Sequence, residues 1–444
     1  MVYEDVFAKI DVRRKHYAEV GQGEDFVDQF IRQHRAEGGG HTMKITRIET
    51  IRIEDRPNLI WVEVTTDEGL KGLGETFMGA KAVEAYIHET LAPIALGRNP
   101  LEIDKLAGDL VGYLGYRSTG AEMRGNSAFD IALWDLFGKA TGQPIAQLLG
   151  GFTRPDIKTY NTCAGTEYIK KAEGQNTANF GLNDAPKGEY DDLNAFMTCA
   201  DELAHSLLEE DITAMKIWPF DVAAEKTRGQ YIEKADLKAA LEPFEKIRKA
   251  VGDKMDIMVE LHLMWQLLPA IEIARALEPY GTYWHEDPIK MDSLSSLKRY
   301  AEASPAPIAA SETLGSRWAF RDLLETGVAG VMNLDISWCG GLSEARKIAS
   351  MAETWHLPIA PHDCTGPVVL AASTHLSLNA PNALTQESVR AFYKTWYRDL
   401  VTALPRIEKG RVTVPPGPGL GLELNPEIDQ VSTTYRKVSD LAEV

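Results

Sequence analysis

One pattern repeats along the chain from about residue 155 to residue 404. Short apolar runs, each closed by a polar residue, alternate with stretches of amphipathic helical periodicity. The residues that close the last six runs are Glu260, Glu286, Glu312, Asp335, His362 and Glu387. They are 26, 26, 23, 27 and 25 residues apart, a spacing typical of units of one strand and one helix. Seven or eight such units close into a parallel barrel, so the repeat predicts an α/β protein with a (β/α)8-type barrel over 155–404.

Two further runs precede these six. The run TAMKIW is closed by Lys216, which lies 44 residues before Glu260, and the charged stretch AAEKTRGQYIEKADLK accounts for the longer connection. The run TYNTCAG at 159–165 supplies an earlier strand. With these two runs the number of predicted strands reaches the eight that a closed barrel needs.

The segments that flank the barrel have a different pattern. From Met43 the sequence alternates apolar and polar residues between turn pairs, which predicts an antiparallel meander of about three strands. From about 80 to 150 the apolar residues recur at helical spacing, so we expect 43–154 to form an α+β unit. The Pro- and Gly-rich segment 405–444 is strand-like and is expected to return to this unit. Residues 1–42 are rich in charge and are interpreted as an appended arm or as sequence upstream of a start at Met43, with the second preferred.

Charge and cysteine content limit the partners and the compartment. The chain has 47 Lys and Arg against 65 Asp and Glu, a formal net charge of −18 at pH 7. Such a chain is repelled by phosphate backbones and anionic membranes. It contains no apolar run long enough to span a bilayer and no secretory signal. Its four cysteines lie far apart without metal-finger spacing, so we expect a cytoplasmic protein that binds neither nucleic acid nor membrane.

Three of the run-closing residues predict a metal site. The carboxyl ends of parallel barrel strands face one mouth, so Glu260, Glu286 and Glu312 are expected to bring three carboxylates together. Such a cluster cannot stay ionised and unpaired. All-oxygen ligation with open positions suits Mg²⁺ best, and we therefore predict that these three residues bind Mg²⁺.

Two histidines at the same mouth predict proton transfer. Asp335 and His362 close neighbouring strands, and an aspartate that accepts a hydrogen bond from imidazole raises its basicity, so the pair is interpreted as a general base. His262 follows Glu260 by two residues, and the two-residue period of a strand points it to the same mouth, where it could act as an acid. His285 directly precedes Glu286 and is expected to face away.

Two more run-closing residues complete the predicted site. Lys216 can stabilise anionic oxygen, and Glu387, if protonated in this anionic mouth, can donate a hydrogen bond to a developing enolate. One metal, one base and these two groups define the abstraction of a proton next to a carboxylate, so the predicted substrate is a small-molecule carboxylate.

At these residues the chain resembles a known family. The run AFDIALWDLFGKATGQPIAQLLGG, the run CGGLSEARKIASMAE after Asp335, and PGPGLGLEL near the C-terminus are similar to sequences of the enolase superfamily, in its mandelate racemase and muconate lactonizing enzyme-like subgroup. The similarity extends from Met43 to about residue 425. It implies a modified (β/α)7β barrel under an α+β cap that is completed by C-terminal segments, and it implies a homo-oligomer.

The resemblance also assigns roles. The predicted metal ligands match the family's ligands, the Asp335–His362 pair matches its base, and Glu387 matches the group that stabilises the enediolate. There are two departures. Glu260 stands where aspartate is more frequent, and in MKIWPFD only Lys216 of the family's Lys-x-Lys motif is present, because Trp218 replaces the second lysine.

These departures bear on the reaction that the resemblance implies. A racemase that uses two bases of the usual kind would lack its lysine, whereas the Glu260-Leu261-His262 arrangement resembles acid-sugar dehydratases that pair a histidine base with a histidine acid. The favoured function is the conversion of an aldonate or aldarate to a 2-keto-3-deoxy acid. The alternatives are an epimerase, racemase or cycloisomerase on the same fold and a non-catalytic metal-binding barrel. Trp218, Tyr116 and Arg117 are expected to line the substrate pocket.

Overall fold

The structure is a computed structural model, and it describes residues 42–112, 115, 119–172, 176–182, 188 and 190–443. The N-terminal segment 1–41 and the predicted substrate residues Tyr116 and Arg117 lie outside the described residues. Within the described part, no helix is both long enough and apolar enough to cross a membrane.

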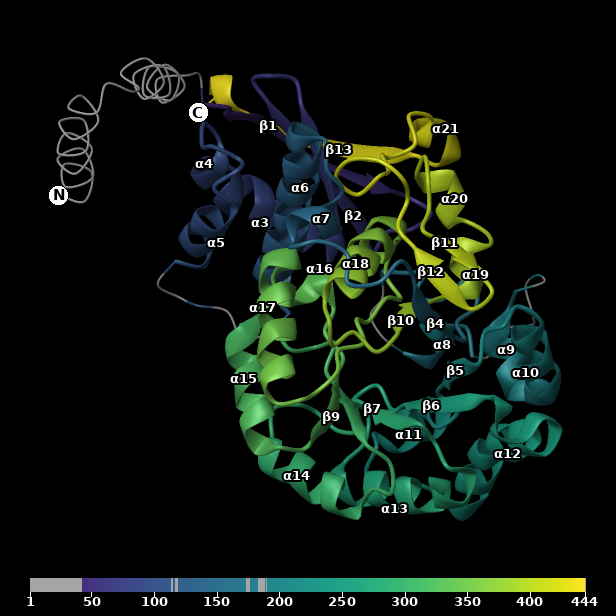
Figure 1. The fold of residues 1–444 in the computed structure, drawn as a ribbon. Helices are drawn as coiled ribbons and strands as arrows, with labels where there is room; N and C mark the ends of the chain where they lie inside the picture. The colour runs from purple at the N-terminus through teal and green to yellow at the C-terminus, as the bar shows by residue number, and fades with distance from the viewer. Residues whose placement is uncertain are drawn as a thin grey trace, which may run out of the picture. The chain divides into compact units, whose positions relative to one another are not determined.

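A four-stranded antiparallel sheet forms the core of the cap (Figure 1). Its strands are β1 (Ile45–Ile53), β2 (Leu59–Thr66), β3 (Lys71–Phe77) and β13 (Thr434–Asp440), in the order β13-β1-β2-β3. The first three form the predicted meander, since β1 pairs with β2 and β2 with β3. The fourth comes from the other end of the chain and pairs with β1.

Helix α6 (Ala121–Thr141) packs closely on β3 because two glycines of that strand allow it. A Cβ atom at Gly72 would lie 2.0 Å from the Ala132 carbonyl oxygen, and one at Gly74 would lie 1.8 Å from that of Ala128. Only glycine therefore fits at these two positions of the strand. The other helices of the cap include α3 (Ala80–Tyr86), α4 (Ala92–Ala95), α5 (Ile103–Val111) and α7 (Ile145–Leu148).

The predicted barrel is present. Its parallel strands, each paired with the next, are β4 (Ile157–Thr162), β5 (Ala214–Ile217), β6 (Asp256–Glu260), β7 (Trp284–Glu286), β8 (Ile308–Ala310) and β9 (Ala329–Met332). The seventh position is held by Ile359, which forms isolated parallel bridges to Met332 and Ala383. The last strand, β10 (Gln386–Ser388), pairs in parallel with β4 and closes the barrel. The fold is a modified TIM barrel of (β/α)7β type with an α+β cap.

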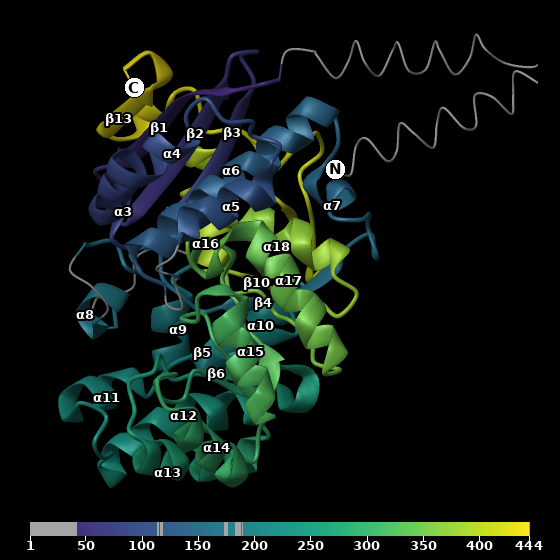
Figure 2. The ribbon, with the colours of Figure 1, turned by 90° about the vertical axis from the view of Figure 1, so that its left-hand side faces the viewer.

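Helices surround the barrel strands (Figures 1 and 2). The larger ones are α10 (Ala200–Glu209), α12 (Lys234–Val251), α13 (Leu267–Leu277), α14 (Leu294–Ala303), α15 (Ser316–Thr326), α17 (Gly341–Thr354) and α18 (Pro367–Asn379). The interior of the barrel is filled by buried side chains, most of which come from its strands. This inner cluster consists of Tyr160, Met258, Trp284, Ala309, Val331 and Ala360.

The C-terminal segment divides between the two parts of the fold. The sequence predicts that the whole segment returns to the cap. In the structure its end, β13, lies in the cap sheet. Its beginning forms the hairpin of β11 (Arg406–Glu408) and β12 (Arg411–Thr413), and β12 pairs with β4 in the barrel sheet. The reason is that β10 covers β4 only from Thr159 to Asn161, which leaves Ile157 and Lys158 to pair with β12.

Candidate active site

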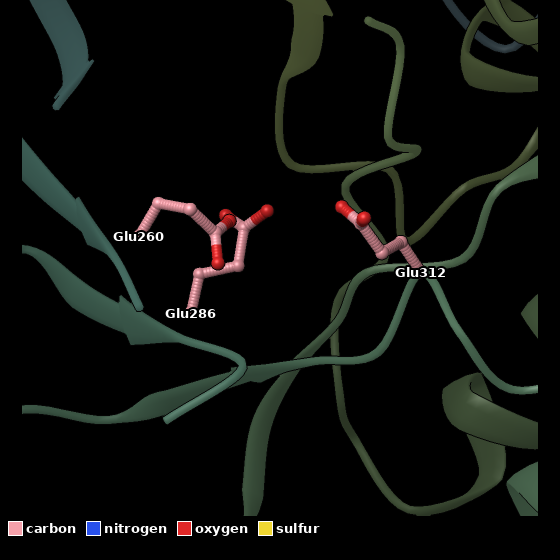
Figure 3. A group of neighbouring side chains, drawn as sticks. All are labelled: Glu260, Glu286 and Glu312. Atoms are coloured by element: carbon pink, nitrogen blue, oxygen red, sulfur yellow. The ribbon is translucent and has the colours of Figure 1, made fainter. Parts of the chain in front are cut away.

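Three carboxylates meet at the mouth of the barrel. Glu260 is the last residue of β6, Glu286 is the last residue of β7, and Glu312 follows the end of β8 by two residues. Figure 3 shows the carboxylates of Glu260 and Glu286 side by side, with Glu312 pointing toward them from the opposite side. One oxygen atom from each can be chosen so that all lie within 4.8 Å of one another, and all three side chains are buried. The structure thus brings together the residues that the sequence predicts as metal ligands.

The electrostatics of this cluster fit a bound cation. Burial raises the pKa of Glu286 well above its usual value, in opposition to Lys216, and burial also raises the pKa of Glu312. Among the described residues, the buried Oε2 atom of Glu260 has no hydrogen-bond partner. A hard divalent cation with oxygen ligands would neutralise the cluster and satisfy this atom.

Lys216 lies among the same carboxylates. Its Nζ atom is 2.5 Å from Oε1 of Glu286, 2.9 Å from Oε1 of Glu387 and 3.6 Å from Oε2 of Glu260. Burial lowers the pKa of Lys216, but the carboxylates of Glu286 and Glu387 outweigh it and raise the pKa well above the usual value. The lysine is therefore a buried permanent cation beside the predicted metal site.

Glu387 differs from its predicted state. Burial works to raise its pKa, but Lys216, His362 and the Thr162 hydroxyl together lower the pKa to about 2. The carboxylate accepts hydrogen bonds from Thr162 Oγ1 and, at 2.9 Å, from the Asp363 amide. These contacts favour the ionised form of Glu387, whereas the sequence analysis gave it a donor role only if it is protonated.

His362 and Asp335 form the predicted pair. Nδ1 of His362 is 2.7 Å from Oδ2 of Asp335, and the other oxygen of Asp335 accepts hydrogen bonds from the amide and hydroxyl of Ser337. Nε2 of the same imidazole lies 3.0 Å from Oε2 of Glu312. Burial lowers the pKa of His362, but Glu312, Glu387 and Asp335 raise it well above the usual value. Nε2 of His362 thus faces the carboxylate cluster.

His262 has a carboxylate partner that the sequence analysis missed. Its Nδ1 atom is 2.7 Å from Oδ2 of Asp221, the first residue of α11 (Asp221–Thr227). Burial lowers the pKa of His262, but Asp221 and Glu260 outweigh it and raise the pKa to about 9. The mouth therefore holds a second histidine–carboxylate pair, which is protonated at neutral pH.

The side chain of His262 reaches the mouth, but not through the two-residue period of a strand, as the sequence analysis expected. Strand β6 ends at Glu260, and His262 and Leu263 have φ angles of 47° and 58°, so the strand period does not continue to them. Instead the chain turns sharply, and the His262 amide donates a hydrogen bond of 2.6 Å to Oε1 of Glu260.

A cavity lies in front of these groups. It is lined by Lys216, Trp218, Glu260, His262, Glu312 and His362, together with Phe77, Met78, Tyr168 and Trp338, among others. Trp218 is thus at the cavity, as predicted, and its ring centroid is 5.6 Å from that of His262. The hydroxyl of Tyr168 lies 3.5 Å from Nε2 of His262, and the ring of Trp338 is 5.5 Å from that of His362. Phe77 and Met78 bring the cap into the site.

Two other histidines lie outside the site. His285 faces away from the mouth and bonds to the hydroxyls of Thr282 and Tyr300, in agreement with the expectation from its neighbour Glu286. His375 is buried in α18, where it contacts the Ala146 amide and the Leu420 carbonyl.

Most of the chain is similar to known proteins. Residues 45–150 match the family model of the mandelate racemase / muconate lactonizing enzyme N-terminal domain, and residues 199–428 match that of the enolase C-terminal domain-like family. D-xylonate dehydratase of Haloferax volcanii is 29% identical over 87% of this chain and 88% of its own length. D-galactonate dehydratase of Xanthomonas campestris is 31% identical over 87% of this chain and 93% of its own length.

A solved structure is more similar in sequence. The crystal structure of an enolase of the mandelate racemase subgroup from Agrobacterium tumefaciens is 70% identical and has a TM-score of 0.81. The match covers 90% of this chain and 100% of that one. The chain belongs to the mandelate racemase / muconate lactonizing enzyme family of the enolase superfamily. It is an enzyme of the dehydratase class, a hydro-lyase.

Proposed function

We propose that the protein dehydrates an acid sugar, an aldonate or aldarate, to a 2-keto-3-deoxy acid. The observation that carries this proposal is the pair of histidines, His362 and His262, which line one cavity and each have a carboxylate at Nδ1. Dehydration needs one group to remove the proton next to the carboxylate and another to protonate the departing hydroxyl. The names of the relatives support the same substrate class.

His362 is the base in this proposal. Asp335 holds Nδ1, so that Nε2 is available to take the proton from C2 of the substrate. The electron pair of the broken C–H bond moves into the carboxylate and produces an enediolate. Positive charge beside the carboxylate is needed for this step, and Lys216 provides part of it.

His262 is the acid. Because its pKa is raised to about 9, the imidazole carries the proton that it must give to the hydroxyl on C3. The electron pair of the enediolate then forms the C2–C3 double bond, the C3–O bond breaks and water leaves. The enol that remains becomes the 2-keto-3-deoxy acid when its hydroxyl proton moves to C3.

The three glutamates Glu260, Glu286 and Glu312 would hold Mg²⁺. When bound, the ion would supply positive charge beside the substrate carboxylate and neutralise Glu312, the carboxylate that most raises the pKa of His362. Glu387 keeps Lys216 in place, because it accepts an ion-pair contact of 2.9 Å from Nζ and is fixed by the Asp363 amide.

The test is a screen of aldonates and aldarates with the Mg²⁺-loaded enzyme, in which semicarbazide traps the 2-keto product. The proposal predicts a trapped carbonyl product from at least one acid sugar. An epimerase or cycloisomerase that used the same two histidines would change the substrate without yielding a carbonyl, and that result would replace the proposal.

A further inference from the structure

Glu75 is a buried carboxylate of the cap that the proposed reaction does not use. It lies in β3 directly opposite Trp61 of β2, and both side chains are fully buried. Its Oε2 atom accepts a hydrogen bond of 2.6 Å from Nε1 of Trp61. Its Oε1 atom accepts hydrogen bonds of 3.1 and 3.0 Å from the amides of Val368 and Val369, which belong to the barrel.

These two amides are at the N-terminus of helix α18. Side chains of N-cap residues normally accept hydrogen bonds from the second and third amides of a helix, but the N-cap of α18 is Gly366, which has no side chain. Glu75 therefore caps the helix from a strand that is almost three hundred residues away in sequence, and burial raises the pKa of this carboxyl group to about 8.

Helix α18 begins shortly after His362, the proposed base, in the sequence. His362 is fixed on one side by its amide, which bonds to the Leu334 carbonyl at 2.9 Å. The loop that follows it reaches α18 at Pro367, where Glu75 fixes the other side. The segment between His362 and α18 is thus fixed at its far end by a side chain of the cap.

The two residues after Glu75 contact the loop that carries Asp335. Thr76 Oγ1 donates a hydrogen bond of 2.9 Å to the Ser337 carbonyl, and Nε1 of Trp338 donates one of 3.1 Å to the Phe77 carbonyl. Ser337 in turn bonds to Asp335 through its amide and hydroxyl. The end of β3 thus bonds to α18, which follows the His362 segment, and to the short helix Ile336–Cys339, which Asp335 caps. Phe77 and Met78, at the end of this strand, line the cavity.

We propose that Glu75 is a positioning residue for the His362 base: it caps α18 from the cap domain and so ties the loop that carries His362 to the strand that lines the substrate cavity. As a statement about catalysis this rests on the proposed function. The effect of Glu75 on the geometry of the His362–Asp335 pair depends only on the contacts described above. The role of Glu75 and the proposed function can therefore fail separately.

Glu75→Gln tests the proposal, and Asp135→Asn is its matched control. Asp135 is also a fully buried carboxylate of the cap that accepts two amides, those of Leu73 and Leu420, and one side-chain cation, Lys139. It does not contact α18 or either histidine loop in the described part of the chain. Both variants should lower the melting temperature, so stability does not distinguish a positioning role from a structural one.

The distinguishing readout is the proton between Nδ1 of His362 and Asp335, followed by proton NMR of the full chain and assigned by its loss in His362→Asn. We expect this resonance to shift or broaden in Glu75→Gln and to be unchanged in Asp135→Asn. For an acid sugar that the wild type dehydrates, kcat should fall about 10- to 100-fold in Glu75→Gln with little change in KM. A wild-type resonance and kcat in both Glu75→Gln and Glu75→Ala, the second of which removes the oxygen that accepts the two amides, would overturn the proposal.

A second variant reaches the same contact from the helix. In Gly366→Ala, the new Cβ would lie 2.2 to 2.6 Å from the carboxylate atoms of Glu75, whereas the φ angle of −165° suits any residue. This variant should therefore reproduce the NMR change of Glu75→Gln. In a Glu75→Ala background it should add little, because the carboxylate is gone; fully additive effects would contradict the proposal. If the wild type dehydrates no acid sugar, the proposed function fails while the resonance still decides the role of Glu75.

Discussion

Oδ2 of Asp221 lies 2.7 Å from Nδ1 of His262, the same distance that separates Oδ2 of Asp335 from Nδ1 of His362. In both pairs the carboxylate fixes the tautomer and leaves Nε2 for chemistry. Both histidines line one cavity, and we propose that they are two oriented proton-transfer groups. This arrangement suits a reaction that removes one proton and delivers another, as the elimination of water does.

Asp221→Asn should shift the alkaline limb of the pH profile of kcat/KM to lower pH. The acid His262 must be protonated, and its pKa is raised to about 9, so kcat/KM should fall as the pH rises through about 9 in the wild type. Asp221 is the carboxylate that most raises this pKa, so its loss should shift the limb to lower pH. The value at neutral pH should also fall by about 10- to 100-fold, part of what a general acid contributes. An unchanged alkaline limb would show that Asp221 does not control the acid.

Lys216→Met should impair both stability and catalysis. The substitution leaves the buried carboxylates of Glu286 and Glu387 without their cation, and breaking a buried pair in this way costs about 3–5 kcal/mol of the free energy of unfolding. Urea unfolding and kcat/KM would measure the two effects. The control is Lys139→Met, which removes a part-buried cation that bridges Asp135 and Glu423 in the cap. It should destabilise the protein but keep its activity, and a fully active Lys216→Met would refute the role of Lys216.

Removal of the metal should abolish activity reversibly. Chelation should stop product formation, added Mg²⁺ should restore it, and calorimetry should show a lower melting temperature without the ion. Saturation at about 100 times Kd corresponds to about 2.7 kcal/mol of stabilisation. Glu286→Gln removes one charge of the cluster, so titration calorimetry should show much weaker Mg²⁺ binding. Activity that survives complete chelation would exclude the proposed ligand set.

Acid should destabilise the fold through two histidines outside the site. Burial lowers the pKa of His285 and of His375 to about 4, so each is neutral in the folded protein and protonates near 6.5 when unfolded. The stability that they contribute is present above pH 6.5 and is lost as the pH falls toward 4, by about 1.4 kcal/mol per pH unit for each.

His375→Asn isolates one of these contributions, because asparagine can still accept the Ala146 amide. The difference in unfolding free energy between wild type and variant should change in favour of the variant by about 2 kcal/mol between pH 7 and pH 5. A difference that does not depend on pH would mean that His375 is not a buried neutral group.

The sequence was sufficient to predict the groups that a repeating strand places at the mouth. Glu260, Glu286 and Glu312 are found together because the ends of neighbouring parallel strands meet at one edge, and the spacing of the repeat identifies those ends. The same reasoning brings Asp335 beside His362. The first three strands of the cap sheet, β1 to β3, were predictable from their alternation and their turn pairs.

Contacts that do not follow from periodicity could not be predicted. Asp221 reaches His262 from the first position of α11, and nothing in the spacing relates these two residues. The positive φ angles of His262 and Leu263 end the strand period where sequence reasoning extended it. Glu75 likewise appears in the sequence as one polar residue of a strand, and only the packing of the cap on the barrel shows what it contacts. The local signal for a second histidine–carboxylate pair was Asp221, the aspartate of the WPFD segment that follows Lys216.

Exchange of the C2 proton with solvent tests whether His362 removes the proton next to the substrate carboxylate. In D₂O, His262→Asn should exchange the C2 proton of an acid-sugar substrate without forming the 2-keto product, because the base is intact and the acid is missing. His362→Asn should show neither exchange nor product. Exchange at C2 in His362→Asn at the rate seen in His262→Asn would contradict the account, since another group would then be the base.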